Sequence, residues 1–285
     1  MTSGAFVRQQ SRFRGHPHGG PERHHLYVAL ACPWSQRAVI VRAVLGVEIG
    51  ISYAHPYRDE RGWAFTGGRF TDEVNGFEFL EQAYRETDPG YDGRVSVPVL
   101  WDTEDRVIVS NESADIVRIF NEWADGDLYP DELRAEIDEL NEFVYENVND
   151  GVYRTGFART QSAYERSFGR LFDALDELDA RLATRRYLMG GTITEADWRL
   201  FPTLLRFDPV YVGHFKCNLR RVVDYPQLSG YLRELYQSPG IAETVDMDHI
   251  KRHYYRTHPT LNPLRIVPVG PALDLTAPHG REHLS

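Results

Sequence analysis

Short apolar runs rich in β-branched and aromatic residues occur in the first half of the chain, where they predict strands. The runs lie at residues 25–30, 49–55, 95–102 and 105–110. Amphipathic segments predict a helix that Gly46 ends, a short helix at 77–86 and a helix at 111–123. The resulting order, β-α-β followed by β-β-α, is typical of a thioredoxin-like domain.

Strand patterns stop near Tyr129, and the second half of the chain predicts only helices. These helices are expected at residues 131–153, 161–184, 194–206, 226–237 and 241–255. The third opens with Thr194 and Asp197 at the spacing of a capping box. We therefore expect an α/β plus all-α fold, with a thioredoxin-like domain at 25–127 and a helical domain at 128–258. Residues 1–24 and the Pro-rich residues 259–285 lack periodicity and are expected to form an irregular leader and tail.

The composition is that of a folded protein that does not bind nucleic acid. Of the 285 residues, 42% are hydrophobic and 26% are charged, which is enough apolar material for a full core. The net charge of -10 argues against non-specific binding to nucleic acid. No run of about 18 apolar residues is present, so no membrane span is expected. The first residues lack the apolar core of a secretory signal, and a cytoplasmic location is the default expectation.

The cysteines and histidines do not suggest a structural metal site. The two cysteines, Cys32 and Cys217, could form one disulfide, although a cytoplasmic chain of this size needs none. The histidines of the leader fit no standard zinc spacing, so no metal is expected. The remaining question is whether either thiol is reactive.

Cys32 occupies a position that favours a reactive thiolate. It follows the first predicted strand and precedes Pro33, a residue that suits the first turn of a helix. The partial positive charge of a helix N-terminus lowers the pKa of such a thiol below its usual value of about 8.5. We therefore expect Cys32 to be a nucleophile, whereas Cys217 lacks this context and is expected to be a buried structural residue.

Three further features describe the surroundings of this thiol. Ser35 stands where a second cysteine would resolve a disulfide, so a mixed disulfide on Cys32 requires an external thiol. Pro98 is expected to follow a cis peptide bond that presents the backbone of Val97 to a peptide-like ligand. Glu112 and Ser113 open a helix whose N-terminus could bind a carboxylate and an ammonium group, although helix capping alone would also explain them.

Several longer stretches resemble one family. They are HLYVALACPWSQR (25–37), VPVLWD (97–102), VSNESADIVRIFN (109–121), NVNDGVYRTGF (147–157), ITEADWRLFPTLLRFDPVYVGHFKCN (193–218) and DHIKRHYY (248–255). In these stretches the chain resembles the glutathionyl-hydroquinone reductases, the Xi class of the glutathione transferase superfamily. The resemblance implies a thioredoxin-like domain, a helical transferase domain and a homodimer.

The resemblance also implies an activity and a set of residues. The activity is removal of glutathione, or of a related thiol such as mycothiol, from thiolated hydroquinones, with no bound cofactor. Cys32 would attack the thiol sulfur, while Tyr153, Tyr211 and Tyr254 would surround the aromatic ring, with Tyr255 as an alternative to Tyr254. The residues implied to hold the thiol are Trp63, Arg94, Val97, Glu112 and Ser113.

Two other functions remain open at this point. A conventional glutathione transferase would conjugate the thiol to electrophiles, or remove it from small disulfides, but it would use Ser or Tyr where this chain has Cys32. A ligand-binding protein without activity would not require a cysteine that caps a helix beside ligand-binding residues. The reductase is therefore the expected function.

Overall fold

A four-stranded sheet forms the core of the first half of the chain in the computed structural model, which describes residues 4–284. Its strands are β1 (His24–Val28), β2 (Gly50–Tyr53), β3 (Val99–Asp102) and β4 (Val107–Ser110), in the order β2-β1-β3-β4. β1 pairs with β2 in parallel and with β3 in antiparallel fashion, and β3 and β4 are antiparallel. This mixed sheet confirms the predicted thioredoxin-like arrangement.

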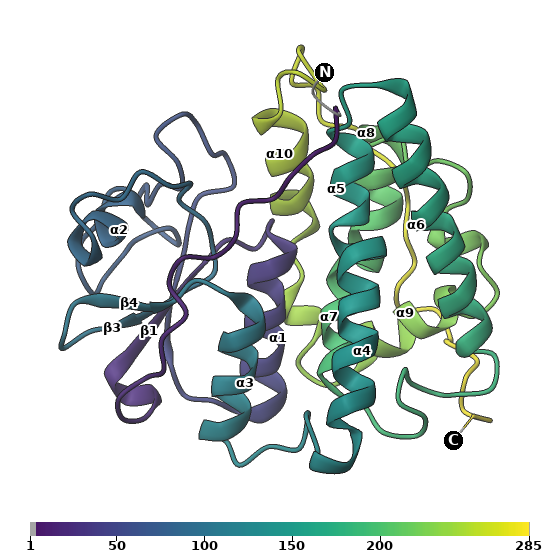
Figure 1. Cartoon of the computed structure of the whole chain (residues 1–285), viewed down its shortest axis with the longest axis horizontal. Coiled ribbons are helices and arrows are strands. Elements are labelled where there is room, and N and C mark those ends of the chain that lie inside the picture. Colours follow the sequence, from purple (N-terminus) through teal and green to yellow (C-terminus); the bar gives the residue numbers. More distant parts are fainter. Residues whose placement is uncertain (1–3, 285) are drawn as a thin grey trace.

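Helices cover both faces of the sheet (Figure 1). α1 (Pro33–Leu45) and α3 (Ser113–Trp123) lie between the sheet and the helical half of the molecule, and α2 (Glu81–Thr87) lies on the far side. α1 packs against both α3 and α7 (Glu195–Arg206), so one apolar core runs from the sheet into the helical half. A second, more aromatic core lies on the other face of the sheet and contains Tyr27, Trp63, Phe65, Phe77 and Trp101.

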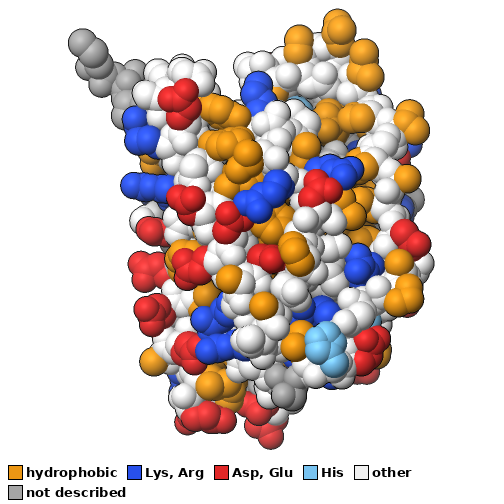
Figure 2. Space-filling view, turned by 90° about the vertical axis from the view of Figure 1, so that its right-hand side faces the viewer, with side chains coloured by type: hydrophobic (Ala, Val, Ile, Leu, Met, Phe, Trp, Pro, Cys, Tyr) orange, Lys and Arg blue, Asp and Glu red, His pale blue; other side chains and the backbone are white. Residues whose placement is uncertain are grey.

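The second half is helical, as predicted. Besides α7 it contains α4 (Arg134–Val144), α5 (Gly151–Gly156), α6 (Gln161–Arg181), α8 (Val212–His214), α9 (Leu228–Gln237) and α10 (Met247–Thr257). None of the helices within residues 4–284 is both long and apolar enough to cross a bilayer. Figure 2 looks onto the side of the molecule farthest from the sheet, where acidic and basic side chains are interspersed and apolar side chains gather toward the top.

Three predicted helices differ from the observed ones, and one of them, the short helix expected at 77–86, begins only at Glu81. The single helix expected at 131–153 is divided into α4 and α5 by a wide turn at Tyr145–Asn149, in which the Asp150 N–H donates to the Tyr145 carbonyl at 2.8 Å. The helix expected at 241–255 begins later, because the Asp246 carboxylate caps α10 by accepting from the His249 N–H at 2.8 Å.

The leader and the tail are irregular, as predicted, but both are held against the body. The leader runs between the two halves of the molecule (Figure 1). It is joined to the sheet half by the Gly15 N–H, which donates to Val109 O at 2.8 Å, and by the Asn111 N–H, which donates to Phe13 O at 3.0 Å. In the tail, buried Arg281 donates to the carbonyl oxygens of Arg185 and Arg186, both at 2.8 Å, and to Leu182 O at 3.3 Å.

Candidate active site

Cys32 lies at the junction between β1 and α1, where it is the N-cap residue of the helix. Its N–H donates to Ala29 O at 2.9 Å, which fixes the turn that follows the strand. The helical half also holds this turn, because buried Arg206 donates to Leu30 O and to Ala31 O, both at 2.9 Å. The thiol is therefore attached to a backbone that is fixed from both sides.

The backbone of Val97 lies beside the thiol. The peptide bond between Val97 and Pro98 is cis, as predicted. The Sγ atom of Cys32 lies 3.6 Å from the carbonyl oxygen of Val97, close enough for a thiol hydrogen bond. A ligand that paired with this backbone would therefore have its sulfur next to Cys32.

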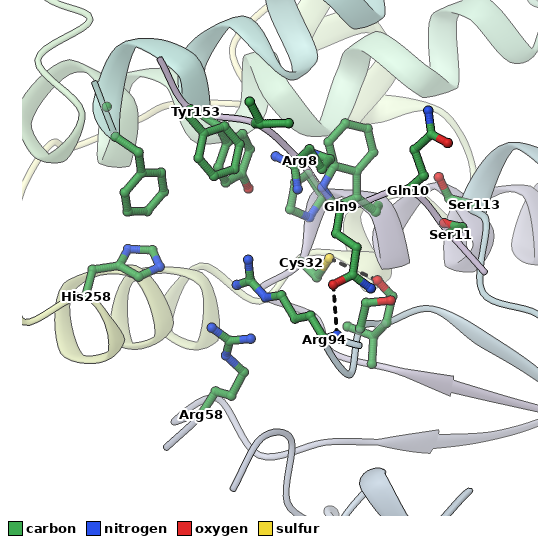
Figure 3. A pocket seen from close by; sticks show the side chains of 18 of the residues that line it. Arg8, Gln9, Gln10, Ser11, Cys32, Arg58, Arg94, Ser113, Tyr153 and His258 are labelled. Atoms are coloured by element: carbon green, nitrogen blue, oxygen red, sulfur yellow. Dashed lines mark hydrogen bonds between the residues drawn. The ribbon is translucent and has the colours of Figure 1, made fainter. Parts of the chain in front are cut away.

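A pocket of about 1300 Å³ opens around Cys32 (Figure 3). Its wall is formed by the sheet half, the helical half and the leader residues 4–11. Of the nine residues that the sequence singled out for the site, Tyr211 alone does not line this pocket. The eight that do are Cys32, Trp63, Arg94, Val97, Glu112, Ser113, Tyr153 and Tyr254.

Three tyrosine hydroxyl groups form a connected chain at one side of the pocket. The Tyr254 hydroxyl lies 2.5 Å from that of Tyr153 and 3.1 Å from that of Tyr211. Tyr211 is fully buried and does not line the pocket itself, but it contacts both Tyr254 and the ring of Tyr153 (centroids 6.1 Å apart). Burial raises the pKa of all three phenols, so they are neutral and can donate hydrogen bonds. The neighbouring Tyr255 donates to Pro209 O at 3.1 Å and is not part of this wall.

Glu112 and Ser113 lie where α3 begins. Glu112 is itself the N-cap residue, and its carboxylate accepts from the Ala114 N–H at 3.1 Å. The hydroxyl of the leader residue Ser11 donates to the other carboxylate oxygen of Glu112 at 2.9 Å. Ser113 is buried and lines the pocket. This helix end combines backbone donors with one carboxylate, a set that can bind the α-amino and α-carboxyl groups of an amino acid.

Trp63 and Arg94 also line the pocket. The buried ring of Trp63 stacks on His253, with ring centroids 4.9 Å apart and an interplanar angle of 20°. The backbone N–H of Arg94 donates to the side-chain oxygen of Gln9 at 2.9 Å, and its exposed guanidinium extends toward the cavity (Figure 3). Burial lowers the pKa of His253 to about 3, so this histidine is neutral.

The structure adds residues that the sequence did not reveal. The guanidinium of Arg8 lies over the rings of Trp34 (4.9 Å) and Tyr153 (4.5 Å) and forms an ion pair with Asp150 at 2.6 Å. Arg58 also lines the pocket. Trp34 lies two residues after Cys32 and could have been found from that position, whereas nothing in the pattern of the leader distinguishes Arg8.

The second cysteine has the environment expected of a structural residue. Both cysteines are free thiols, but Cys217 is fully buried and burial raises the pKa of its thiol. Within residues 4–284, no group of three or more His, Cys, Asp or Glu side chains is arranged to hold a metal ion. The pocket itself brings together the Cys32 thiol, the phenols of Tyr153 and Tyr254, and guanidinium groups such as those of Arg58 and Arg94.

Comparison with known proteins identifies similar sequences and structures. Residues 31–123 and 161–234 match the N-terminal and C-terminal domains of glutathione S-transferase, respectively. The chain is 48% identical to glutathionyl-hydroquinone reductase YqjG of Escherichia coli over 99% of this chain and 93% of that protein. It is 49% identical to glutathionyl-hydroquinone reductase PcpF of Sphingobium chlorophenolicum, over 96% and 92% respectively.

Solved structures agree with these sequence matches. The glutathione-bound structure of YqjG superposes with a TM-score of 0.91 at 48% identity, covering 95% of this chain and 96% of that one. A Xi class enzyme from Natrialba magadii superposes with a TM-score of 0.94 at 45% identity, covering 99% of this chain and 94% of that one.

Proposed function

Because the chain belongs to the Xi class of the glutathione transferase superfamily, which includes glutathionyl-hydroquinone reductases, we propose that it removes glutathione from glutathionyl-hydroquinones. The observation that carries this proposal is the position of the Cys32 thiol. It lies at a helix N-terminus, 3.6 Å from Val97 O, in one pocket with the neutral hydroxyls of Tyr153 and Tyr254.

The first step transfers glutathione to the enzyme. The thiolate of Cys32 attacks the sulfur of the thioether, so that a sulfur–sulfur bond forms and the bond between sulfur and the ring carbon breaks. The electron pair of the broken bond stays with the ring carbon, which takes up one proton. The products of this step are the free hydroquinone and a mixed disulfide between Cys32 and glutathione.

The tyrosine chain supports this step. The hydroxyls of Tyr153 and Tyr254 line the pocket and donate to the oxygen atoms of the ring, which favours the keto tautomer that carries a proton on the ring carbon. Tyr211 acts through its hydrogen bond to Tyr254 and does not touch the ring. A chain of three neutral hydroxyl groups can also deliver a proton without creating a buried charge.

The second step regenerates the thiol. A second glutathione thiolate attacks the mixed disulfide at the glutathione sulfur, releasing oxidised glutathione and the Cys32 thiolate. Ser35 has no sulfur to take part, and its hydroxyl is buried and accepts from the Ala29 N–H at 3.3 Å. The sum of both steps is one conjugate and one glutathione converted to one hydroquinone and one glutathione disulfide.

The residues that we propose to bind the thiol line the same pocket as Cys32. Glu112 and Ser113 would hold the γ-glutamyl end, and the backbone of Val97 would pair with the cysteinyl residue. Trp63 and Arg94 would contact the remaining part of the peptide. The glutathione-bound structure of YqjG supports glutathione as the cosubstrate, and a thiol that lacks a γ-glutamyl group would lose the contacts at Glu112 and Ser113.

Three broader properties are part of the same proposal. We assign residues 25–127 and 128–258 to a thiol-binding and a substrate domain, in agreement with the two matched family segments. A cytoplasmic location supplies the reduced thiol that the second step consumes. A homodimer is supported by the exposed apolar side chains of the tail at Leu264, Ile266 and Val269, and light scattering after gel filtration would measure it.

The test is an assay of hydroquinone release. Purified protein is mixed with glutathionyl-menadiol and either glutathione or mycothiol, and free menadiol is measured beside Cys32→Ala and Cys217→Ala variants. We expect release with glutathione that is lost in Cys32→Ala and retained in Cys217→Ala. Conjugation of an electrophile by Cys32→Ala, without release of hydroquinone, would contradict the proposal and indicate a conventional transferase.

A further inference from the structure

An unpaired positive charge faces the pocket at Arg58. This residue lies in the loop between β2 and α2, and its guanidinium lies 5.8 Å from the centre of the Trp63 ring. Within residues 4–284 it has neither an ion pair nor a hydrogen bond, and the side chain of Arg94 has none either. Figure 3 shows both guanidinium groups extending into the cavity near Cys32. Arg8, in contrast, is paired with Asp150.

Within residues 4–284, Arg58 and Arg94 are neighbouring cations without a carboxylate partner. Asp and Glu outnumber Lys and Arg by 42 to 32, and many other arginines are paired with a carboxylate. Burial and the neighbouring charge of Arg94 lower the pKa of Arg58 to about 10, so the pocket destabilises the charged form of this side chain. An anion bound between the two guanidinium groups would stabilise that charged form.

The two histidines near Arg58 do not supply a negative charge. Burial lowers the pKa of His253 to about 3 and that of His258 to about 2, so both histidines are neutral. Of the groups that can carry a negative charge, Cys32 in its thiolate form is the one that acts on Arg58 within the described part of the chain. During the proposed reaction this charge is consumed when the mixed disulfide forms, which leaves Arg58 and Arg94 uncompensated unless the ligand carries an anion.

We propose that Arg58, together with Arg94, binds a carboxylate of the ligand in this pocket. Guanidinium groups match the planar geometry of a carboxylate and can donate two parallel hydrogen bonds to it. The carboxylate has two possible sources: the glycyl end of the thiol, or a carboxyl substituent on the aromatic ring. This inference rests on the proposed function for its ligand, but the charge itself can be tested without turnover.

The first test compares two alkylating reagents that differ in charge. Iodoacetate is an anion and iodoacetamide is neutral, and both react with the same Cys32 thiolate, so their rate ratio is independent of the thiolate fraction. We expect Arg58→Gln to lower the ratio of iodoacetate to iodoacetamide rates about five-fold at low salt, and added salt to shrink this difference. The Cys32→Ala variant gives the background from the buried Cys217.

Arg61→Gln is the matched control. Arg61 lies in the same loop and carries the same charge, but it is exposed, forms an ion pair with Asp59 at 2.6 Å and does not line the pocket. Its variant is expected to keep the wild-type rate ratio, and Arg58→Lys should keep most of it. An unchanged ratio in Arg58→Gln, or an equal fall in Arg61→Gln, would overturn the inference.

The second test identifies the source of the carboxylate by steady-state kinetics. If Arg58→Gln raises the KM of glutathione but not that of its glycyl ethyl ester, the carboxylate belongs to the thiol. If it raises only the KM of a conjugate with a carboxylated ring, the carboxylate belongs to the aromatic substrate. A rise in neither KM overturns the inference. Absence of all turnover in the wild-type protein would instead refute the proposed function, and the alkylation ratio would still decide the role of Arg58.

Discussion

Removal of the Tyr254 hydroxyl group is the sharpest test of the tyrosine chain. In Tyr254→Phe the aromatic ring stays, but the hydroxyl that links Tyr153 (2.5 Å) and Tyr211 (3.1 Å) is lost. Loss of a positioned proton donor typically slows a reaction by about 10²- to 10⁴-fold. We therefore expect the rate of hydroquinone release in a single turnover to fall at least about 100-fold, with little change in the affinity for the conjugate.

The expected cost in stability is small enough to leave the variant folded. The buried hydroxyl of Tyr211 loses its hydrogen bond to Tyr254, which costs at most about 1–3 kcal/mol. Tyr255→Phe is the matched control, because it also removes one phenol hydroxyl and breaks the hydrogen bond to Pro209 O (3.1 Å), but outside the pocket. Urea denaturation should show that the two variants lose similar amounts of unfolding free energy, while Tyr255→Phe keeps the wild-type rate.

Two results would refute this argument. If Tyr254→Phe released hydroquinone within about three-fold of the wild-type rate, this hydroxyl would not donate in the reaction. If Tyr255→Phe were slowed as much as Tyr254→Phe, the loss would reflect disturbed packing. The pH profile adds a third check: burial raises the pKa of Tyr254, so the rate of the first step should not fall through ionisation of this phenol below about pH 10.

Three further outcomes follow from contacts outside the tyrosine chain. Arg206→Met leaves the buried carbonyl of Ala31 and the partly buried carbonyl of Leu30 without their donor, and urea denaturation should show a loss of at least about 1–3 kcal/mol. Arg8→Met removes the ion pair to Asp150 and the contacts with two rings, so limited proteolysis should cut the leader faster than in the wild type. The free energy of unfolding should be highest above pH 6.5 and should decrease as the pH falls toward 4. The reason is that the histidines of the unfolded chain bind protons in this range, whereas the buried histidines of the folded chain do not. Each buried histidine contributes at most about 1.4 kcal/mol per pH unit to this decrease. The expectation rests on four histidines whose pKa burial lowers, to about 3 in His253 and to about 4 in His25, His214 and His249. A urea midpoint that is unchanged between pH 7 and pH 5 would contradict it.

The parts of the fold that local pattern determines could be predicted from the sequence. The strand before Cys32 and the helix after it depend on neighbouring residues alone, and both were found within a few positions. The helix expected at 131–153 was wrong in its middle because distant partners hold the wide turn. The Asn149 side chain accepts from Arg37 at 2.6 Å, and the Asp150 carboxylate accepts from Arg8 at 2.6 Å, which favours turning both side chains inward.

The candidate site likewise contains residues that local sequence could predict and residues that it could not. Cys32 could be assigned from its local context, whereas Trp63 and Arg94 came from the resemblance to a family. Arg58 and Arg8 were missed, since each becomes part of the pocket only when a loop or the leader folds over it. An arginine in an irregular segment carries no periodic pattern that would distinguish it from a solvated surface charge.

The need for an external thiol and the shape of the pocket are connected. Once Cys32 is part of a mixed disulfide, buried Ser35 offers no sulfur, so the second thiol must enter through the same cavity. The cavity of about 1300 Å³ exceeds the usual range for one small ligand, about 300–1,000 Å³, and leaves room for a second molecule beside the bound one. Arg58 and Arg94 face that space with no counter-ion among residues 4–284, and when no ligand carboxylate occupies them their field favours an anionic thiol over a neutral one. Of the two sources of the carboxylate, only a ring substituent leaves with the hydroquinone, and only in that case are both guanidinium groups free again to attract the second thiol.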